Sequence, residues 1–182
     1  MNNVDNLGLK KGVVELIDYD NDYTRIYLEE KENLKRILNG KYIRIEHVGS
    51  TAIKNIKSKP IIDILVTCKD LLEFQNFVKE NVESETYTLK EIQEGAQDFL
   101  IRKEEDGKVK AFIHVVLEDS AIAQEYILFR DYLNKYPEEA KKYENLKLEL
   151  LKKYKDDRPK YTEGKHEYIR NIIEKAKNEE RI

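Results

Sequence analysis

Residues 43–67 decide the fold, and they read IRIEHVGSTAIKNIKSKPIIDILVT. This stretch holds a short apolar strand, a Gly-Ser-Thr turn at residues 49–51, a short helical stretch, and a second apolar strand with one carboxylate, Asp63. Glycine lets the backbone approach a ligand closely, and the first N–H groups of a helix have no intrahelical partner. A lone Asp in an apolar strand is costly to bury without a cation or hydrogen-bond donors. Together the two features indicate a site for phosphate and a metal ion, although the same turn is also typical of a simple helix cap.

The composition is that of a folded chain of about one domain by the usual length prior. The 182 residues carry a formal net charge of −3, and 38% of them are charged, with both signs interspersed. This balance gives no strong signal for nucleic-acid binding, although a local basic cleft is compatible with it. The single cysteine, Cys68, excludes a disulfide framework and a cysteine-based zinc site.

The apolar runs give no sign of a membrane partner. Residues 1–12 lack the apolar core of a secretory signal, and the longest apolar run, residues 61–67, is too short to span a bilayer. We therefore expect a soluble, cytoplasmic protein.

The periodicity of the apolar residues predicts a sheet followed by helices. Helices are expected over residues 20–38, 70–82, 120–136, 137–154 and from 161 to the end, and strands over 42–48, 60–67, 86–90, 98–103 and 109–118. Asp70 and Glu73 have the spacing of a capping box, and Asp106-Gly107 accepts the positive φ angles of a tight hairpin turn. The pattern predicts an α+β fold with a mixed sheet of four or five strands and flanking helices.

The order of the elements also predicts the organisation of the chain. Residues 1–118 are expected to form the α/β core with its N-terminal helix. Residues 119–182 are expected to form a C-terminal helical segment that packs on this core as one compact unit.

The two-residue period of a strand assigns side chains to the faces of the sheet. In residues 60–67, Asp63 and Leu65 share one face, and in residues 109–117 His114 lies opposite a continuous apolar face. His114 can therefore stand beside Asp63 if these strands are neighbours, or it can be a packed histidine. Glu46 and His47, just before the turn, can supply a carboxylate or a proton carrier, or they can orient the turn through hydrogen bonds.

Several separated motifs match a known family in order. They are Ile45-Glu46-His47-Val48-Gly49-Ser50-Thr51-Ala52, Lys59-Pro60-Ile61-Ile62-Asp63-Ile64, Tyr19-Asp20 with Tyr23, Ile113-His114-Val115-Val116, Phe129-Arg130-Asp131-Tyr132-Leu133, Tyr143 with Lys147, and Tyr161 with Lys165. With these motifs the chain resembles the GrpB-like family (glutamate-rich protein B) nearly end to end.

The resemblance implies a nucleotidyltransferase-like fold. Its signature is a Gly-Ser turn that holds the phosphates of a nucleoside triphosphate, followed by a strand with Asp-x-Asp or Asp-x-Glu that holds Mg²⁺. In this chain Leu65 stands where the second acid belongs, and His114 stands where a third acid is expected on a neighbouring strand. Mg²⁺ prefers oxygen ligands, so either Glu46 or another acid completes a weaker site, or a softer metal is used, or the catalytic set has decayed.

Three cations in the helical half match the family motifs. Tyr143 with Lys147 and Tyr161 with Lys165 repeat one i,i+4 pair, which places each lysine on the face of its tyrosine. With Arg130, these lysines can converge on phosphates above the sheet, or they can be simple solvated charges.

Three hypotheses follow for the function. The first is a metal-dependent nucleotidyltransferase that moves a nucleoside monophosphate from an NTP to an unknown acceptor, which can be a protein. Its expected catalytic residues are Asp63, His114, Lys147 and Lys165, its ligand-binding residues Gly49, Ser50, Thr51 and Arg130, its metal ligands Asp63 and Glu46, and its metal Mg²⁺ or Mn²⁺. The second is a non-catalytic binder of a nucleotide or phosphorylated small molecule, or a partner-regulating module. The third is a scaffold that docks another protein through its helices.

Overall fold

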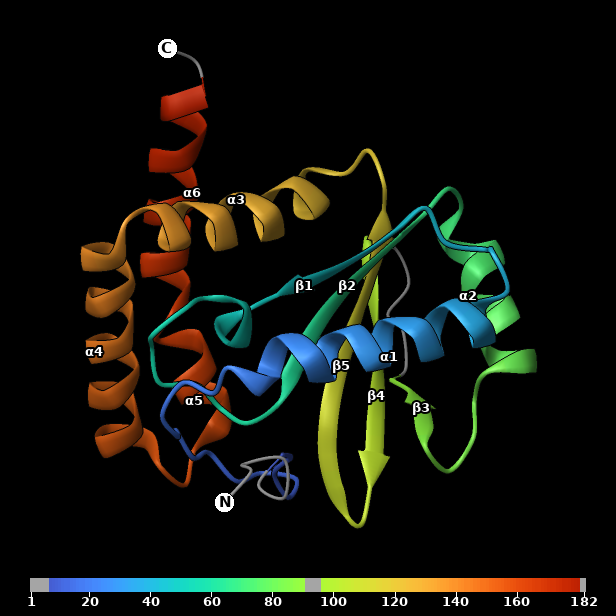
Figure 1. Ribbon diagram of the computed structural model, residues 1–182, viewed down its shortest axis with the longest axis horizontal. Helices are drawn as coiled ribbons and strands as arrows, with labels where there is room; N and C mark the ends of the chain where they lie inside the picture. Colours follow the sequence, from blue (N-terminus) through green and yellow to red (C-terminus); the bar gives the residue numbers. More distant parts are fainter. Residues whose placement is uncertain (1–6, 91–95, 181–182) are drawn as a thin grey trace.

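The computed structural model describes residues 7–90 and 96–180, whose helices surround one sheet (Figure 1). The strands are β1 (Arg44–Val48), β2 (Ile62–Cys68), β3 (Tyr87–Leu89), β4 (Asp98–Glu105) and β5 (Lys108–Leu117). In these described residues the sheet has the order β1-β2-β5-β4-β3. Strands β2 and β5 run parallel, and the other neighbouring pairs are antiparallel. The expected α+β class with a mixed sheet is confirmed.

The helices follow the predicted order except at the C-terminal end. They are α1 (Asp22–Leu38), α2 (Leu71–Asn81), α3 (Ala121–Lys135), α4 (Pro137–Tyr154), α5 (Arg158–Glu163) and α6 (His166–Glu180). The single helix expected from residue 161 onward is wrong, because two helices occupy this segment. Asp157 caps α5 by accepting from the Lys160 N–H at 3.1 Å, and Pro159 lies in its first turn. Gly164 then packs so tightly that a Cβ there would lie 2.4 Å from a methyl carbon of Leu150.

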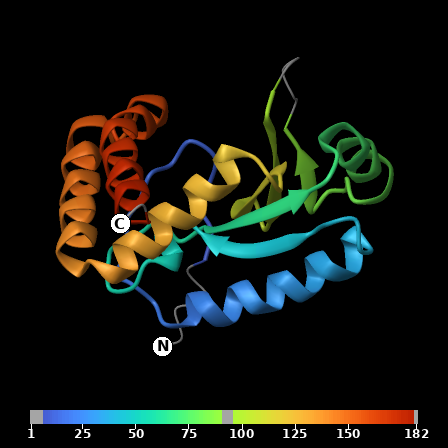
Figure 2. The same ribbon diagram turned by 90° about the horizontal axis from the view of Figure 1, so that it is seen from above.

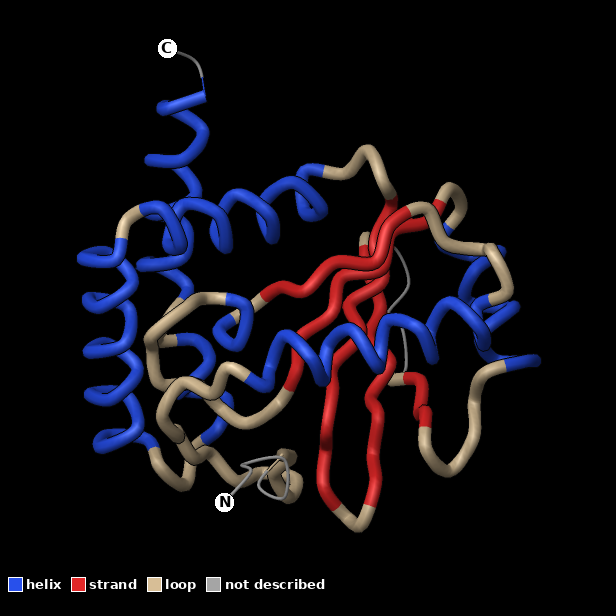
Figure 3. Tube along the Cα trace, in the orientation of Figure 1, coloured by secondary structure: helices blue, strands red, loops and turns tan. Residues whose placement is uncertain are grey.

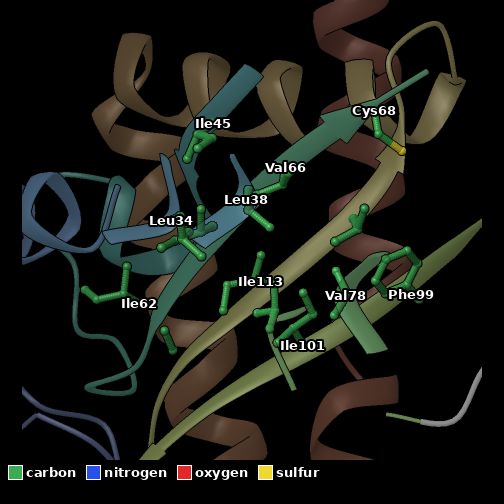
Figure 4. Packing of buried hydrophobic residues seen from close by; sticks show 14 of the residues in the cluster. Leu34, Leu38, Ile45, Ile62, Val66, Cys68, Val78, Phe99, Ile101 and Ile113 are labelled. Atoms are coloured by element: carbon green, nitrogen blue, oxygen red, sulfur yellow. The ribbon is translucent and has the colours of Figure 1, made fainter. Parts of the chain in front are cut away.

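Helices α1 and α2 cover one face of the sheet. Figure 2 shows α1 along one side of the strands and α3 on the other side. The buried side chains between α1, α2 and the sheet form the main core, part of which is drawn in Figure 4. They include Tyr27, Leu34, Leu38, Phe74 and Val78 from the helices, and Ile45, Ile64, Val66, Phe99, Ile101 and Ile113 from the strands. These strand residues occupy alternate positions, so their neighbours in sequence point to the opposite face.

A second apolar cluster joins the C-terminal helices to the connection between β1 and β2. Its members are Ile53, Ile56, Phe129, Leu133, Ala140, Tyr143, Ile172 and Ile173. The connection, largely tan in Figure 3, reaches α4, where the Lys57 N–H donates to the Glu144 carboxylate at 2.7 Å. Among the described residues, no helix is long and apolar enough to cross a membrane. The division of the chain at residue 118 stays a prediction.

The strand register decides which polar side chains share a face. Val48 of β1 pairs with Asp63 of β2, and Leu65 of β2 pairs with His114 of β5. Paired residues point to the same face of a sheet, so Asp63 and His114 both lie opposite the face that α1 and α2 cover. Strands β2 and β5 are neighbours, as the predicted proximity of Asp63 and His114 requires.

Candidate functional site

The turn after β1 and the acid of β2 meet at one point. Gly49 has a φ of 69° and a ψ of −167°, a conformation that is essentially restricted to glycine. A Cβ at this position would lie 2.5 Å from Oδ2 of Asp63, so a larger residue would displace the carboxylate. The turn and the acid therefore face the same space.

The helical stretch after this turn is shorter than expected. Ser50–Ala52 form one turn of 3₁₀ helix, in which the Ala52 N–H donates to the Gly49 carbonyl at 3.2 Å. The Ile53 N–H donates to the Ser50 carbonyl at 3.3 Å. So short an element offers a phosphate individual N–H and hydroxyl groups rather than the dipole of a regular helix.

Asp63, His114 and Tyr126 form a chain of hydrogen bonds. His114 Nε2 lies 3.2 Å from Asp63 Oδ1, and the Tyr126 hydroxyl lies 3.0 Å from His114 Nδ1. Burial opposes the ionisation of Asp63, but the hydrogen bond from His114 and the charges of His114, Lys59 and Lys165 hold its pKa below the usual value. An ionised carboxylate only accepts, so His114 Nε2 donates to Asp63, and in the tautomer with its proton on Nε2 the ring accepts the Tyr126 O–H at Nδ1. Burial raises the pKa of Tyr126, which keeps this hydroxyl protonated at neutral pH.

Three cations stand beside this chain without an acidic partner. Lys59 Nζ lies 5.8 Å and the Arg158 guanidinium carbon 5.5 Å from the ring centroid of Phe112. Lys165 Nζ lies 5.0 Å from the ring centroid of Tyr161. Over the described chain, none of the three cations has a carboxylate within 4.0 Å. Burial lowers the pKa of Lys59, and burial together with the charge of Lys59 lowers the pKa of Lys165 to about 8.

These groups line one cavity of about 990 Å³ between the sheet and helices α3, α5 and α6. Gly49, Ser50 and Asp63 lie in its wall with the three cations. Apolar side chains form much of the remaining wall, and they include Leu100, Val109, Phe112, Ile122, Phe129, Ile169 and Ile173. The volume is at the upper end of the roughly 300–1,000 Å³ that small-molecule sites enclose. The cavity thus combines a charged region with an apolar one.

Glu46 and Arg130, two of the predicted site residues, bind one another instead. Arg130 Nη1 lies 3.1 Å from the Glu46 carboxylate and donates to the His47 carbonyl at 2.9 Å. Its Nε donates to Asp131 at 2.7 Å. Neither Glu46 nor Arg130 lies among the residues that line the cavity. Arg130 therefore ties α3 to β1.

His47 and Thr51 support the turn from the face of α1. The His47 ring stacks on Tyr27 with 4.8 Å between the centroids, and its Nε2 lies 2.9 Å from the Thr51 hydroxyl. Burial lowers the pKa of His47 to about 4, so the ring is neutral at neutral pH. Since Thr51 is itself buried, both residues position the turn rather than contact the cavity.

Lys147 is fully buried beside the site and also lies outside the cavity lining. Its Nζ donates to the Lys57 carbonyl and lies 4.8 Å from the ring centroid of Tyr143. Burial and the nearby charge of Lys165 lower the pKa of Lys147 to about 7. Of the three predicted helical cations, Lys165 alone faces the cavity, and it follows Gly164 between two helices rather than lying within one.

The described side chains do not fit the magnesium site that the family resemblance implies. They contain no group of three His, Cys, Asp or Glu residues that could hold a metal ion. Asp63 offers one free oxygen, because His114 binds the other, and the Glu46 carboxylate is bound to Arg130. Mg²⁺ requires oxygen ligands in near-octahedral geometry, so this donor set is poor even with ligand phosphates added.

Lys59, Phe112, Tyr126 and Arg158 were missed as site residues. The sequence offers partial signals for two of them. Lys59 precedes the strand that carries Asp63, and Tyr126 lies four residues before Arg130, on the same side of a helix. Arg158 lies nearly a hundred residues beyond Asp63, and no local pattern connects it to the sheet.

Comparison with known proteins assigns the chain to a family. The model of the GrpB protein family matches residues 13–175. The glutamate-rich protein GrpB of Alkalihalophilus pseudofirmus is 37% identical over 170 residues, which cover 92% of this chain and 98% of that protein. The crystal structure of conserved protein GrpB from Enterococcus faecalis matches with a TM-score of 0.82 and 26% identity, over 92% of this chain and 100% of that chain.

A weaker likeness is to Cid1 in complex with the UTP analogue UMPNPP. It has a TM-score of 0.48 and 14% identity over 76% of this chain and 42% of that chain. A likeness of this strength says nothing of the activity of this protein. The family match agrees with the motifs of the sequence and with the fold, and the chain belongs to the GrpB protein family.

Proposed function

We propose that this protein binds a nucleotide or another phosphorylated small molecule in the cavity above β2 and β5. The observation that carries the proposal is the convergence of Lys59, Arg158 and Lys165 on one cavity without acidic partners among the described residues. Partly buried cations without a salt-bridged carboxylate favour an anionic ligand, because the ligand would offset the cost of their desolvation. Lysine binds phosphate as a point charge and arginine as a planar fork, so the set suits a ligand with several phosphate oxygens.

The apolar part of the cavity suits the remainder of such a ligand. Ile122 and Phe129 of α3 line this region together with Ile169 and Ile173 of α6. A nucleobase or another flat, weakly polar group would bury apolar surface there while its phosphates reach the Gly49 turn.

Calorimetric titration of the whole chain with ATP, GTP, CTP and UTP tests this proposal. We expect at least one of them to bind, and we expect Lys59→Met and Lys165→Met to weaken that binding about tenfold or more, since a charged hydrogen bond contributes about 1.5–3 kcal/mol. Methionine keeps the length of the apolar stem. Lys152→Met is the matched control, because Lys152 is exposed on α4 and lies outside the cavity. The proposal fails if neither a nucleotide nor inorganic tripolyphosphate binds, or if all three variants behave alike.

Nucleotidyl transfer to a hydroxyl acceptor is the second candidate. The hydrogen-bonded chain from Asp63 through His114 to Tyr126 favours it, because these groups can relay a proton. The acceptor oxygen would attack the α-phosphorus of the NTP, and the bond from this phosphorus to the pyrophosphate oxygen would break, so that pyrophosphate leaves. The acceptor hydroxyl would give its proton to the Tyr126 oxygen as the tyrosine proton moves to His114 Nδ1, and Asp63 would stabilise the imidazolium. The metal-dependent form of the reaction has little support in the donor set described above.

Pyrophosphate release from an NTP in the presence of candidate acceptors tests this second function. We expect Tyr126→Phe to abolish release and to leave NTP affinity nearly unchanged, because the ring would still fill its place beside His114. If NTP binds but no candidate acceptor gives pyrophosphate release, nucleotidyl transfer is ruled out and ligand binding stays the proposed function.

A further inference from the structure

Side chains already supply positive charge where a metal ion would stand. Asp63 faces the cavity with Oδ2, next to Gly49, and Oδ1 accepts from His114. Lys59 and Lys165 lie close enough to help to hold this carboxylate ionised. A divalent cation at Oδ2 would meet these two like charges in a partly buried space, where charge repulsion is poorly screened.

The other acids of the region add little to a metal site. Glu163 lines the cavity, but the described residues contain no group of three His, Cys, Asp or Glu residues that could hold a metal ion. Glu125 lines the cavity, but Lys177 binds its carboxylate at 2.9 Å. Arg130 binds Glu46 at 3.1 Å, and Leu65 stands two residues after Asp63 on the same face of β2. Acids that are bound to cations and cations that lack a salt bridge thus occur around the same cavity.

The cations also reach the cavity from separate segments of the chain. Lys59 and Arg158 both lie over Phe112, and Lys165 extends from the turn between α5 and α6. Their positions are set by three different parts of the chain, and the aromatic rings of Phe112 and Tyr161 hold their stems.

We propose that this site takes its phosphorylated ligand as the free anion, without a divalent cation, and that Lys59, Arg158 and Lys165 replace the charge of the metal. This inference rests on the proposed ligand binding and adds the ionic form in which the ligand is recognised. Free ATP carries more negative charge than Mg-ATP, so a metal-free site of three cations selects the uncomplexed form.

The test is calorimetric titration of the whole chain with inorganic tripolyphosphate and with ATP, each in EDTA and in excess MgCl₂ or MnCl₂. We expect binding in EDTA, and we expect either metal to weaken it several-fold by sequestering the anion. Binding that requires Mg²⁺ or Mn²⁺ would overturn the inference while leaving the proposed function in place. Absence of binding by both probes in every buffer would instead overturn the proposed function, and the inference with it.

Two variants sharpen the test. For the first, a metal-free site and a metal site predict opposite changes in affinity. Asp63→Asn keeps the shape of the side chain and removes a negative charge that faces the ligand. We expect it to tighten tripolyphosphate binding in EDTA about two- to tenfold, whereas at a metal site the same change would abolish binding. Arg158→Met should weaken binding about tenfold or more in EDTA. Circular dichroism checks that both variants are folded, and a loss of affinity in Asp63→Asn would count against the inference.

Discussion

Gly49 is the residue at which backbone conformation and site chemistry meet. Its φ of 69° and the contact with Asp63 leave no room for a side chain. Gly107, in the β4–β5 turn, has a φ of 70°, but a Cβ added there would have nothing within 4 Å, so it carries the conformational cost without the contact. A substitution at Gly107 therefore measures the cost of the backbone conformation alone, whereas one at Gly49 adds the cost of crowding the Asp63 carboxylate.

We expect Gly49→Ala to destabilise the protein by at least about 1 kcal/mol more than Gly107→Ala, because the new methyl group must displace the Asp63 carboxylate. Urea denaturation of both variants measures the difference. Equal losses of stability would mean that the carboxylate moves aside freely and that the turn does not fix its position.

His47 makes stability depend on pH in a definite window. Burial lowers its pKa from 6.5 to about 4, so the unfolded chain binds a proton in this range that the folded chain excludes. The contribution of His47 to the free energy of unfolding should be fully present above about pH 6.5. It should fall as the pH drops toward 4, by up to about 3 kcal/mol at 1.36 kcal/mol per pKa unit. We expect His47→Phe, which keeps a ring against Tyr27, to flatten this part of the profile.

Denaturation at a series of pH values between 4 and 7 provides the measurement. His166→Gln is the matched control, because His166 is an exposed histidine at the start of α6. If the pH dependence of stability persisted in His47→Phe and disappeared in His166→Gln, its source would be His166, and the prediction for His47 would be wrong.

At the scale of the elements, Arg130 holds α3 against β1. Its guanidinium binds the Glu46 carboxylate and the His47 carbonyl, both on the strand that leads into the Gly49 turn. We expect Arg130→Gln to destabilise the protein by about 1–3 kcal/mol, because partly buried acceptors lose a charged donor. Its effect on ATP affinity should stay within about twofold, since Arg130 lies outside the cavity lining.

The comparison variant for this prediction is Lys165→Met, which should show the reverse pattern. Lys165 has no hydrogen-bonded carboxylate within the described residues, so its removal should change stability little and affinity strongly. If Arg130→Gln reduced affinity as much as Lys165→Met did, Arg130 would have to be counted among the ligand-binding residues.

At the scale of the whole molecule, the cavity lies between the sheet and the C-terminal helices, while α1 and α2 pack on the opposite face of the sheet. Figure 2 shows α1 on the side of the strands away from α3. A ligand that contacts both Lys59, just before β2, and Arg158, on α5, connects the sheet to the C-terminal helices. We expect saturating tripolyphosphate to slow amide hydrogen exchange more in residues 158–173 than in α1 and α2. At a hundred times the Kd, the gain in overall stability would be about 2.7 kcal/mol.

Hydrogen exchange followed by mass spectrometry checks this expectation, with the peptides of α1 serving as the internal reference. Uniform slowing over the whole chain would indicate global stabilisation only. Protection confined to α1 would place the ligand on the wrong face of the sheet.

The sequence was sufficient for features that depend on a few neighbouring residues. The expected N-cap of α2 is present, with the Asp70 carboxylate accepting from the Glu73 N–H at 2.8 Å. The Asp106-Gly107 turn has both of its φ angles positive, at 53° and 70°, as a tight hairpin requires. The faces of β2 and β5 also followed from their periodicity, because side chains alternate along any strand.

The tertiary structure decided which distant side chains meet. Asp63 and His114 are 51 residues apart, and their hydrogen bond depends on the parallel pairing of β2 with β5. It also decided that Arg130 and Lys147 are bound to protein groups while Lys59, Arg158 and Lys165 face the cavity without acidic partners among the described residues. Local periodicity states the direction of a side chain relative to its own element, whereas the pairing of charges depends on how elements pack, which no local pattern encodes.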